Sequence, residues 1–451
     1  MSTYFAYAAL VTGLTALVGL WFHRVLLKNS NWWFFVPLIY GYLWNQTSLV
    51  ALERGFFITE QGTVSEFSGA ALRYWIFFCF VLLGFISSCP KDHPGGPLFH
   101  SGQFNRQTAR ALIIACAIVT FSLAANAALS PSGWSGGIDR FNWWENSRFP
   151  GLRQLTGEVC WPVTYGVGIC FAIGAGSNDR FLRWSSAICV IAYLFFLFRM
   201  GQKYNGFIPP LFALSIPTLI LFRVRPSFTN YSLSQARAAR RLLFAVGVAA
   251  GFLLVMASSW FALNWQNSRM AMGPLENLAY RVFILQAHTY YGADYMHFQE
   301  RFPSSEALRE LRDNNFESIP TVMKLIGDQD LVQDYQTRGV RFATIHPAIS
   351  ILAGGIPLAT LTSFVIGAIA GLGSRFFLLG TTSRSILLQY SGVSLGLFAY
   401  GLFMMSDLSS VLSLKFLLPL SMGVAIITLP KPPTAIRSQP LPLPNRARLG
   451  S

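Results

Sequence analysis

Long apolar runs separated by short polar segments dominate the chain from end to end. A helix needs about 20 mostly apolar residues to cross a bilayer, and a helix satisfies its backbone polar groups internally, as hydrocarbon requires. Runs of this kind predict eleven transmembrane helices, at about 4–22, 32–50, 69–89, 111–129, 156–174, 184–199, 206–222, 242–263, 347–371, 385–406 and 410–429.

The sixth and seventh runs are the weakest, because a short break at Gly201–Gly206 separates them. An alternative interpretation makes them re-entrant half-helices, and totals of ten or twelve spans also fit the pattern. Most Lys and Arg residues of the short connecting segments fall on the side that holds Lys91–Arg110. Cytoplasmic segments carry such an excess, so we expect the N-terminus outside and the C-terminus inside.

The spans divide the chain into four parts. We predict an N-terminal transmembrane bundle at 1–263, a long outward loop with short helices at 264–346, and C-terminal spans at 347–429. The remaining 430–451 segment is rich in Pro and basic residues, which is typical of a flexible cytoplasmic tail near anionic lipid.

Composition agrees with an all-α polytopic membrane protein. Hydrophobic residues make up 53% and charged residues 12%, against about 25% charged in an ordinary globular domain. This excludes a disordered chain and argues against a soluble one. The net charge of +15 does not indicate nucleic acid as a partner, because much of it is the topology signal. The six Cys residues lack metal-type spacing and are interpreted as small hydrophobes.

Few polar residues fall inside the predicted spans. Asn45, Gln46 and Lys415 are the exceptions, and Arg73 and Glu158 lie near outward ends, where snorkelling explains them. We favour helix–helix hydrogen bonds for Asn45 and Gln46. An ion-coupled transport pathway normally requires more such groups at mid-membrane, so transport is disfavoured.

Three outward segments hold the unusual polar content. The first, at 130–155, interleaves Arg140 with aromatic residues that include Trp143 and Trp144. Such rings are typical of a membrane-interface belt. A carbohydrate site is the alternative, since ring faces pack on sugar C–H groups while Arg and Asn bind hydroxyls.

The second outward segment, at 198–208, places Arg199 and Lys203 around the glycine break. Two cations at a chain break near the membrane edge suit a phosphate, which neighbouring backbone N–H groups would also bind. Ordinary hairpin chemistry with a snorkelled arginine explains the same residues equally well.

The third segment is the long loop. Its first part places Arg281, Gln286 and His288 roughly along one helical side, next to Tyr290 and Tyr291. The stretches PSSEALRELRDN and IPTVMKLIGD predict two short helices, the first with a Ser cap and the second opened by Pro320 and closed by Gly327. A loop with helices of its own predicts a lid or a cavity wall.

The loop ends with Arg338, Arg341 and His346, where the chain returns to the membrane. It also contains Asp328 and Asp330 in a D-x-D spacing, which some glycosyltransferases use to hold a divalent metal. A solvated acidic turn is the favoured interpretation, and the chain has no P-loop-type nucleotide motif. We therefore expect no metal and no cofactor.

Two of these stretches, FRMGQKYNGF at 198–207 and YRVFILQAHTYY at 280–291, together with the layout of spans and the late outward loop, resemble the O-antigen polymerases. The resemblance implies a glycosyltransferase of the integral-membrane, GT-C-like architecture. It would join undecaprenyl-diphosphate-linked oligosaccharide repeat units at the periplasmic face of the bacterial inner membrane. Its partners would be those lipid-linked glycans, membrane lipid and a chain-length-regulating co-polymerase.

Expelling a lipid diphosphate requires positive charge, and a base must take the acceptor proton. We therefore expect Arg281 to contribute to catalysis, with His346 favoured as the base, then His288, and Glu276 and Asp294 as acidic substitutes. The expected diphosphate ligands are Arg199, Lys203, Arg281, Arg338 and Arg341. The expected glycan contacts are Arg140, Trp143, Trp144, Tyr290 and Tyr291.

Three other functions stay open at this point. An O-antigen ligase shares the layout and the same need for Arg and His. A lipid-linked oligosaccharide flippase or another exporter would place charged residues along the spans, and here they are few. A non-catalytic membrane scaffold is the third alternative.

Overall fold

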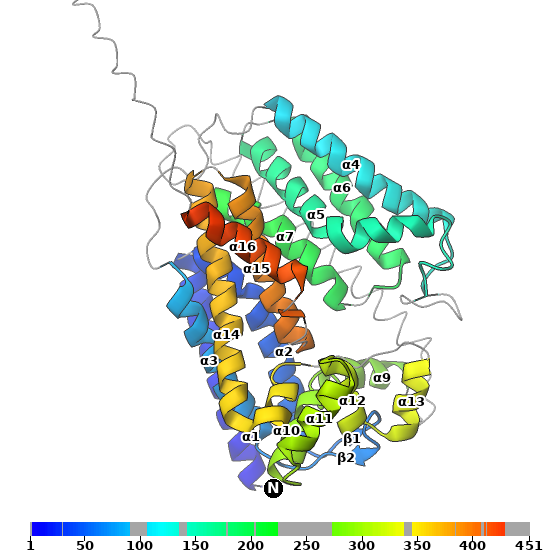
Figure 1. The fold of residues 1–451 in the computed structure, drawn as a ribbon, viewed down its shortest axis with the longest axis vertical. Coiled ribbons are helices and arrows are strands. Elements are labelled where there is room, and N and C mark those ends of the chain that lie inside the picture. The colour runs from blue at the N-terminus through cyan, green and yellow to red at the C-terminus, as the bar shows by residue number, and fades with distance from the viewer. Residues whose placement is uncertain are drawn as a thin grey trace, which may run out of the picture.

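The computed structural model describes residues 2–28, 30–90, 106–134, 142–176, 179–202, 204–223, 273–337, 345–383, 385–406, 410–411 and 413–428. Within these residues the chain is mostly helical, and its strands form one antiparallel hairpin of β1 (Phe57–Ile58) and β2 (Thr63–Val64) (Figure 1). The eighth predicted span, at 242–263, and the tail at 430–451 lie outside the described residues.

The helices before residue 224 follow the first seven predicted spans. They are α1 (Ser2–Lys28), the 3-10 helix η1 (Ser30–Phe35), α2 (Val36–Leu52), α3 (Ala70–Ser88), α4 (Arg106–Leu129), the 3-10 helix η2 (Pro150–Leu152), α5 (Arg153–Gly176), α6 (Arg180–Arg199) and α7 (Tyr204–Arg223).

The later helices belong to the segment predicted as the long outward loop and to the predicted C-terminal spans. The loop contains α9 (Pro274–Ala279), the π-helical turn η3 (Tyr280–Ile284), α10 (His288–Phe298), α11 (Ser304–Asp313), α12 (Ser318–Ile326) and α13 (Gln329–Thr337). The spans are α14 (Ala348–Ser383), which bends at Gly354–Gly355, α15 (Ile386–Met405) and α16 (Leu414–Thr428).

Six helices of the described chain are long and apolar enough to cross a membrane, by length and composition. These segments are Tyr4–Leu26, Ala70–Ser88, Gln107–Leu129, Arg180–Arg199, Ala348–Thr381 and Ile386–Met405. Shorter apolar helices cover Pro162–Gly174, Gly206–Pro217 and Phe416–Thr428. The all-α, multi-pass membrane character is confirmed, while eleven spans and their orientation stay predictions.

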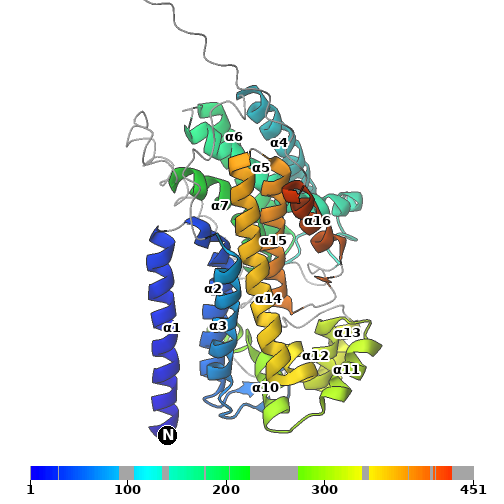
Figure 2. The ribbon, with the colours of Figure 1, turned by 60° about the vertical axis from the view of Figure 1, so that its left-hand side comes forward.

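The helices pack as two groups (Figures 1 and 2). One apolar core joins α1–α3 with α14–α16 and the loop helices and includes side chains of α5 and α7, and a second core lies within α4–α7. The packing of α3 on α14 brings helices from both ends of the chain into the first core, and the predicted domain bounds stay predictions. A hydrogen bond from the Tyr165 hydroxyl to Gln389 Oε1, 2.9 Å long, connects the two groups. The loop helices gather at the end of the molecule where α1 begins.

Polar side chains between α2 and α3 behave as expected. Asn45 Nδ2 donates to the Tyr74 hydroxyl at 3.2 Å, and Gln46 Nε2 donates to the Ala71 carbonyl at 2.8 Å. Both are buried, so the helix–helix interpretation is confirmed. The Lys415 and Glu158 side chains lie outside what the structure describes.

The loop forms the expected short helices with different starts. Pro303 is the N-cap residue of α11 and makes no side-chain cap bond, so the predicted Ser cap is wrong. α12 begins before Pro320, at Ser318, and ends at Gly327 as predicted. The prediction that Arg281, Gln286 and His288 lie along one helical side is also wrong, because the helix is interrupted between η3 and α10.

Ser48 of α2 satisfies the backbone at this break. Its hydroxyl donates to the Ile284 carbonyl at 2.6 Å and accepts from the Ala287 N–H at 3.1 Å. α2 therefore supplies the partners that a continuous loop helix would have supplied itself.

Candidate functional site

The loop between α2 and α3 carries the β-hairpin, and two tyrosines of the long loop at 264–346 bind this loop through their hydroxyl groups. The Tyr280 hydroxyl accepts from the Thr59 N–H at 3.0 Å and donates to the Phe57 carbonyl at 2.8 Å. The Tyr291 hydroxyl accepts from the Glu66 N–H at 2.6 Å and donates to the Glu66 carbonyl at 2.7 Å. Segments more than two hundred residues apart in the chain thus form one unit.

Three ionisable side chains of these segments, Glu60, Arg281 and His288, interact electrostatically, and we call them the hairpin site. Glu60 is 6% exposed and His288 4% exposed, and Arg281 is half-buried. Thr59 Oγ1 donates to Glu60 Oε2. Gln61 Nε2 donates to the His288 carbonyl at 2.8 Å, which fixes the hairpin turn on the first residue of α10.

Burial and the Glu60 charge act in opposite directions on the two basic groups of the hairpin site. Burial lowers the pKa of His288 and of Arg281, and the nearby Glu60 carboxylate partly offsets both shifts. The His288 ring pairs through Nδ1 with the Leu285 carbonyl at 2.5 Å. A carbonyl oxygen can only accept, so Nδ1 carries the hydrogen and Nε2 is the acceptor nitrogen of a neutral imidazole.

Asp328 borders the hairpin site without forming a metal centre. Its N–H donates to the Glu60 carbonyl at 3.0 Å, and its Oδ1 accepts from the Leu331 N–H at 3.1 Å. The carboxylate therefore caps the first turn of α13. The described residues contain no group of three or more His, Cys, Asp or Glu side chains that could hold a metal ion. These contacts agree with an acidic turn at the D-x-D spacing.

A second polar cluster joins α10 to α3. Arg73 donates from Nε to Asp294 Oδ1 at 2.7 Å and from Nη2 to Asp294 Oδ2 at 2.5 Å. The Tyr290 hydroxyl donates to Asp294 Oδ1 at 3.1 Å. The snorkelling interpretation of Arg73 is therefore wrong. Asp294 is also poorly suited to accept an acceptor proton, since both of its oxygens already bind Arg73.

His346, the favoured base, lies elsewhere in this region. Its ring pairs through Nε2 with Ser363 Oγ at 2.8 Å, and the backbone N–H of His346 donates to the Phe403 carbonyl at 3.0 Å. Ser363 uses its own hydrogen on the Ala359 carbonyl, so Nε2 of His346 is the donor. The imidazole is 1% exposed and contacts α14 and α15. These contacts lie with membrane helices, whereas Arg281 and His288 lie with the hairpin.

The remaining charged predictions divide in two. Arg199 donates from Nε to the Ala127 carbonyl at 3.2 Å and from Nη2 to the Ser130 carbonyl at 2.8 Å. A cation on the last carbonyls of α4 is a helix cap, which supports the hairpin-chemistry interpretation. The Glu276 carboxylate accepts from the Gly273 N–H at the start of its own helix. Lys203, Arg338, Arg341 and Arg140 lie outside the described residues.

The predicted glycan contacts are core residues in this structure. Trp143 is 0% exposed and donates from Nε1 to the Pro131 carbonyl at 2.8 Å, and Trp144 packs edge-on against it. Tyr290 and Tyr291 are buried as well. Stacking on a sugar requires an accessible ring face, and these four rings pack against protein in this structure, so their role as glycan contacts stays a prediction.

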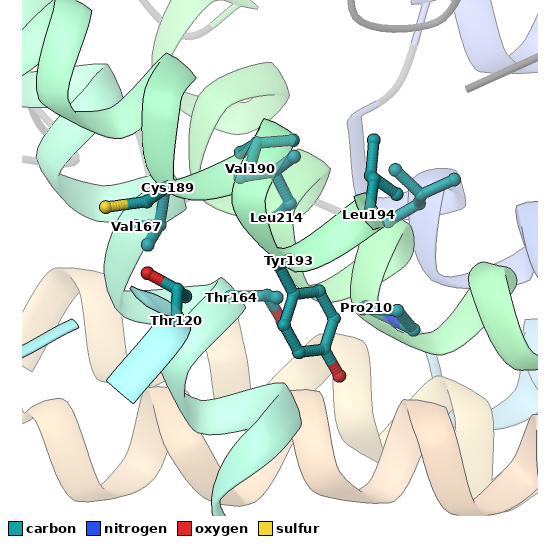
Figure 3. A pocket seen from close by; sticks show the side chains of 10 residues that line it. Thr120, Thr164, Val167, Cys189, Val190, Tyr193, Leu194, Pro210 and Leu214 are labelled. Atoms are coloured by element: carbon teal, nitrogen blue, oxygen red, sulfur yellow. The ribbon is translucent and has the colours of Figure 1, made fainter. Parts of the chain in front are cut away.

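The pocket drawn in Figure 3 lies among α4–α7. Its lining is mainly aliphatic, with hydroxyl groups from Thr120, Thr164 and Tyr193. None of the predicted site residues lines it. A charged, lipid-linked substrate needs cationic partners, so the hairpin site is the better candidate.

Comparison with known proteins gives one match. A family model described as a family of unknown function (DUF6418) matches residues 313–420, which is less than half of the chain. The matched range begins in the last residue of α11 and extends into α16, and it includes His346. No curated protein and no solved structure matches the chain.

Glu60 is the hairpin-site residue that sequence analysis missed. It stands in FITEQGT at 57–63, a short stretch with one acidic residue and no motif. The usable signal was the glycine in this stretch, because Gly62 has φ +69° and turns the hairpin. The sequence pattern indicates only a turn. The packing of this turn against α10 brings Glu60 near Arg281 and His288.

Proposed function

We propose that the protein is a membrane-embedded glycosyltransferase that polymerises undecaprenyl-diphosphate-linked oligosaccharide repeat units in O-antigen or surface-polysaccharide synthesis. One observation carries the proposal. The helical loop places the half-buried Arg281 and the buried His288 within the electrostatic influence of the buried Glu60, at the end of the molecule where α1 begins. A guanidinium, a neutral imidazole and a carboxylate in one site are the groups that this transfer requires.

The reaction needs one bond to form and one to break. An acceptor hydroxyl oxygen bonds to the anomeric carbon of the donor glycan, and the bond from that carbon to the lipid diphosphate breaks. The bonding electrons leave with the diphosphate, whose growing charge a guanidinium stabilises. A diphosphate leaves without a general acid, so the remaining task is removal of the acceptor proton.

In this proposal Arg281 binds the leaving diphosphate, and Glu60 or His288 takes the proton. The Glu60 carboxylate acts electrostatically on both Arg281 and His288. His346 instead contacts Ser363 and Phe403, so it is the less favoured base. Lys203, Arg338 and Arg341 remain proposed ligands for the second phosphate. The site would face the periplasm, and a co-polymerase would set chain length.

The test is deletion of the gene in the native host, followed by complementation. Core carrying a single repeat unit identifies a polymerase, because ligation and flipping continue without it. Core without any repeat identifies the ligase alternative or a flippase. A normal ladder overturns the proposal.

Point variants then test the site. We expect Arg281→Ala and the removal of the base, by Glu60→Gln or His288→Gln, to reduce polymer formation by on the order of 10²–10⁴-fold. Arg309→Ala, which removes an exposed cation of α11, is the matched control and should leave the ladder unchanged. An Arg281→Ala protein that polymerises normally would remove Arg281 from the mechanism.

A further inference from the structure

The ion pair between Arg73 and Asp294 joins parts of the chain that are 221 residues apart. Asp294 is 0% exposed and Arg73 is 24% exposed, and the two side chains meet through two parallel N–H···O bonds. The guanidinium also donates from Nη2 to the Ser68 carbonyl at 2.7 Å and lies 4.3 Å from the centre of the Phe298 ring. A guanidinium held by three hydrogen bonds and an aromatic ring has a fixed orientation.

This orientation controls α10. Successive residues of an α-helix turn by about 100° around its axis. Tyr290 and Asp294, four residues apart, therefore share the face toward Arg73, whereas the His288 carbonyl accepts from Gln61 of the hairpin loop and Thr289 Oγ1 accepts from the Ile345 N–H at 3.4 Å. Rotation of α10 about its axis would break the Arg73 bonds and the bond between Gln61 and His288 together.

Stability alone is a poor explanation for this pair. Taking two charges out of water costs about as much as their attraction returns, and apolar residues of similar size often replace a buried ion pair without loss. What two parallel hydrogen bonds supply is a defined geometry. An apolar contact would allow α10 to shift or rotate more freely on α3.

We infer that Arg73 and Asp294 are positioning residues that fix the rotation of α10 on α3 and so hold His288 in the hairpin site. The catalytic consequence rests on the proposed polymerase function. The geometric consequence does not, because it concerns only where α10 lies.

The experiment is a double-substitution cycle with Arg73→Met, Asp294→Leu and the two together in the full-length protein. Each protein is assayed for repeat-unit polymerisation in the deletion strain. Each is also assayed for hydrogen–deuterium exchange over residues 284–298 in detergent. Glu306→Gln is the control, since Glu306 forms an exposed pair with Arg309 on α11.

We expect each single substitution to leave a buried charge without its partner, to increase exchange in 284–298 and to lower polymerisation on the order of 10²-fold. The double variant should recover most of the polymerisation and most of the protection from exchange, because it contains neither buried charge. Glu306→Gln should match the wild type. If a single variant does not reach the membrane, Asp294→Asn and Arg73→Gln, which remove the charge and keep a polar side chain, replace it in the same comparison.

Two outcomes overturn the inference. A double variant that exchanges normally but stays inactive would make Asp294 or Arg73 a chemical participant. Single variants with wild-type exchange would show that the pair does not hold α10. A deletion strain with a normal polysaccharide ladder would instead remove the proposed function, and the exchange cycle would still decide the positioning role.

Discussion

At the scale of single residues, two tyrosine hydroxyls bind backbone N–H and carbonyl groups that a neighbouring strand would otherwise bind. Tyr280 and Tyr291 each bind one N–H and one carbonyl of the loop that carries the hairpin. A two-stranded hairpin is marginally stable by itself, so these bonds explain how a hairpin of four strand residues keeps a defined place.

Tyr291→Phe should therefore destabilise the protein by about 1–3 kcal/mol, because it leaves the partly buried N–H and carbonyl of Glu66 without their partner. Thermal unfolding in detergent measures the change. Tyr295→Phe is the matched control on the same helix, since that hydroxyl makes one exposed bond of 3.4 Å to Glu66 Oε2. Equal unfolding midpoints for the two variants would contradict the expected role.

His288 should make stability depend on pH. Burial lowers its pKa in the folded protein, so below about pH 6.5 the unfolded chain binds more protons than the folded one. Stability then falls as the pH drops, by up to about 1.4 kcal/mol per pH unit for this one group. Chemical denaturation between about pH 5 and 8 should show a smaller slope for His288→Gln than for wild type or for the control His23→Gln, which changes an exposed residue of α1.

At the scale of elements, the crossing of α3 and α14 depends on glycines. A Cβ on Gly84 would overlap the carbonyl oxygen of Phe364, and a Cβ on Gly367 would overlap that of Val81. Small residues allow membrane helices to approach closely, and the gain is packing rather than burial from water. The apolar sequences of α3 and α14 contain these glycines, but the sequence does not show that they lie where the two helices cross.

Gly84→Ala and Gly367→Ala should each lower stability by about 1–3 kcal/mol, since the added methyl group forces two backbones apart. The unfolding midpoint in detergent is the measurement. Gly13→Ala in α1 is the control, because no atom lies within 4 Å of a Cβ built there. A loss of stability in the control that equals the loss in Gly84→Ala would count against the close crossing.

At the scale of the whole molecule, the loop helices and the β-hairpin assemble at one end, where α1 begins. The distribution of Lys and Arg predicts that this end is outside. Ser305→Cys on α11 should react with a membrane-impermeant maleimide in intact cells, and Ser383→Cys at the end of α14 should react after permeabilisation. Both positions are exposed, and the unsubstituted protein reports the background from native cysteines. The reverse labelling pattern would invert the predicted topology.

The sequence by itself determined the elements whose cause is local. A run of about 20 apolar residues folds as a helix in a membrane wherever it occurs, and ten of the eleven predicted runs coincide with helices of the described chain. Gly327 ends α12 and the short loop helices form for equally local reasons. Asn45 and Gln46 were predictable as interhelical donors, because a polar group inside an apolar helix needs a partner.

Side-chain burial and contacts between distant segments could be read only from the tertiary structure, because they depend on which segments pack together. Burial of Trp143 and Trp144 follows from the packing of α4–α7, since an aromatic ring can serve a core or a surface equally well. The Arg73–Asp294 pair and the bond from Gln61 to the His288 carbonyl join residues more than two hundred positions apart. Periodicity reports which face of a helix is apolar, while the partner of that face is set by the competition of all segments for the same core.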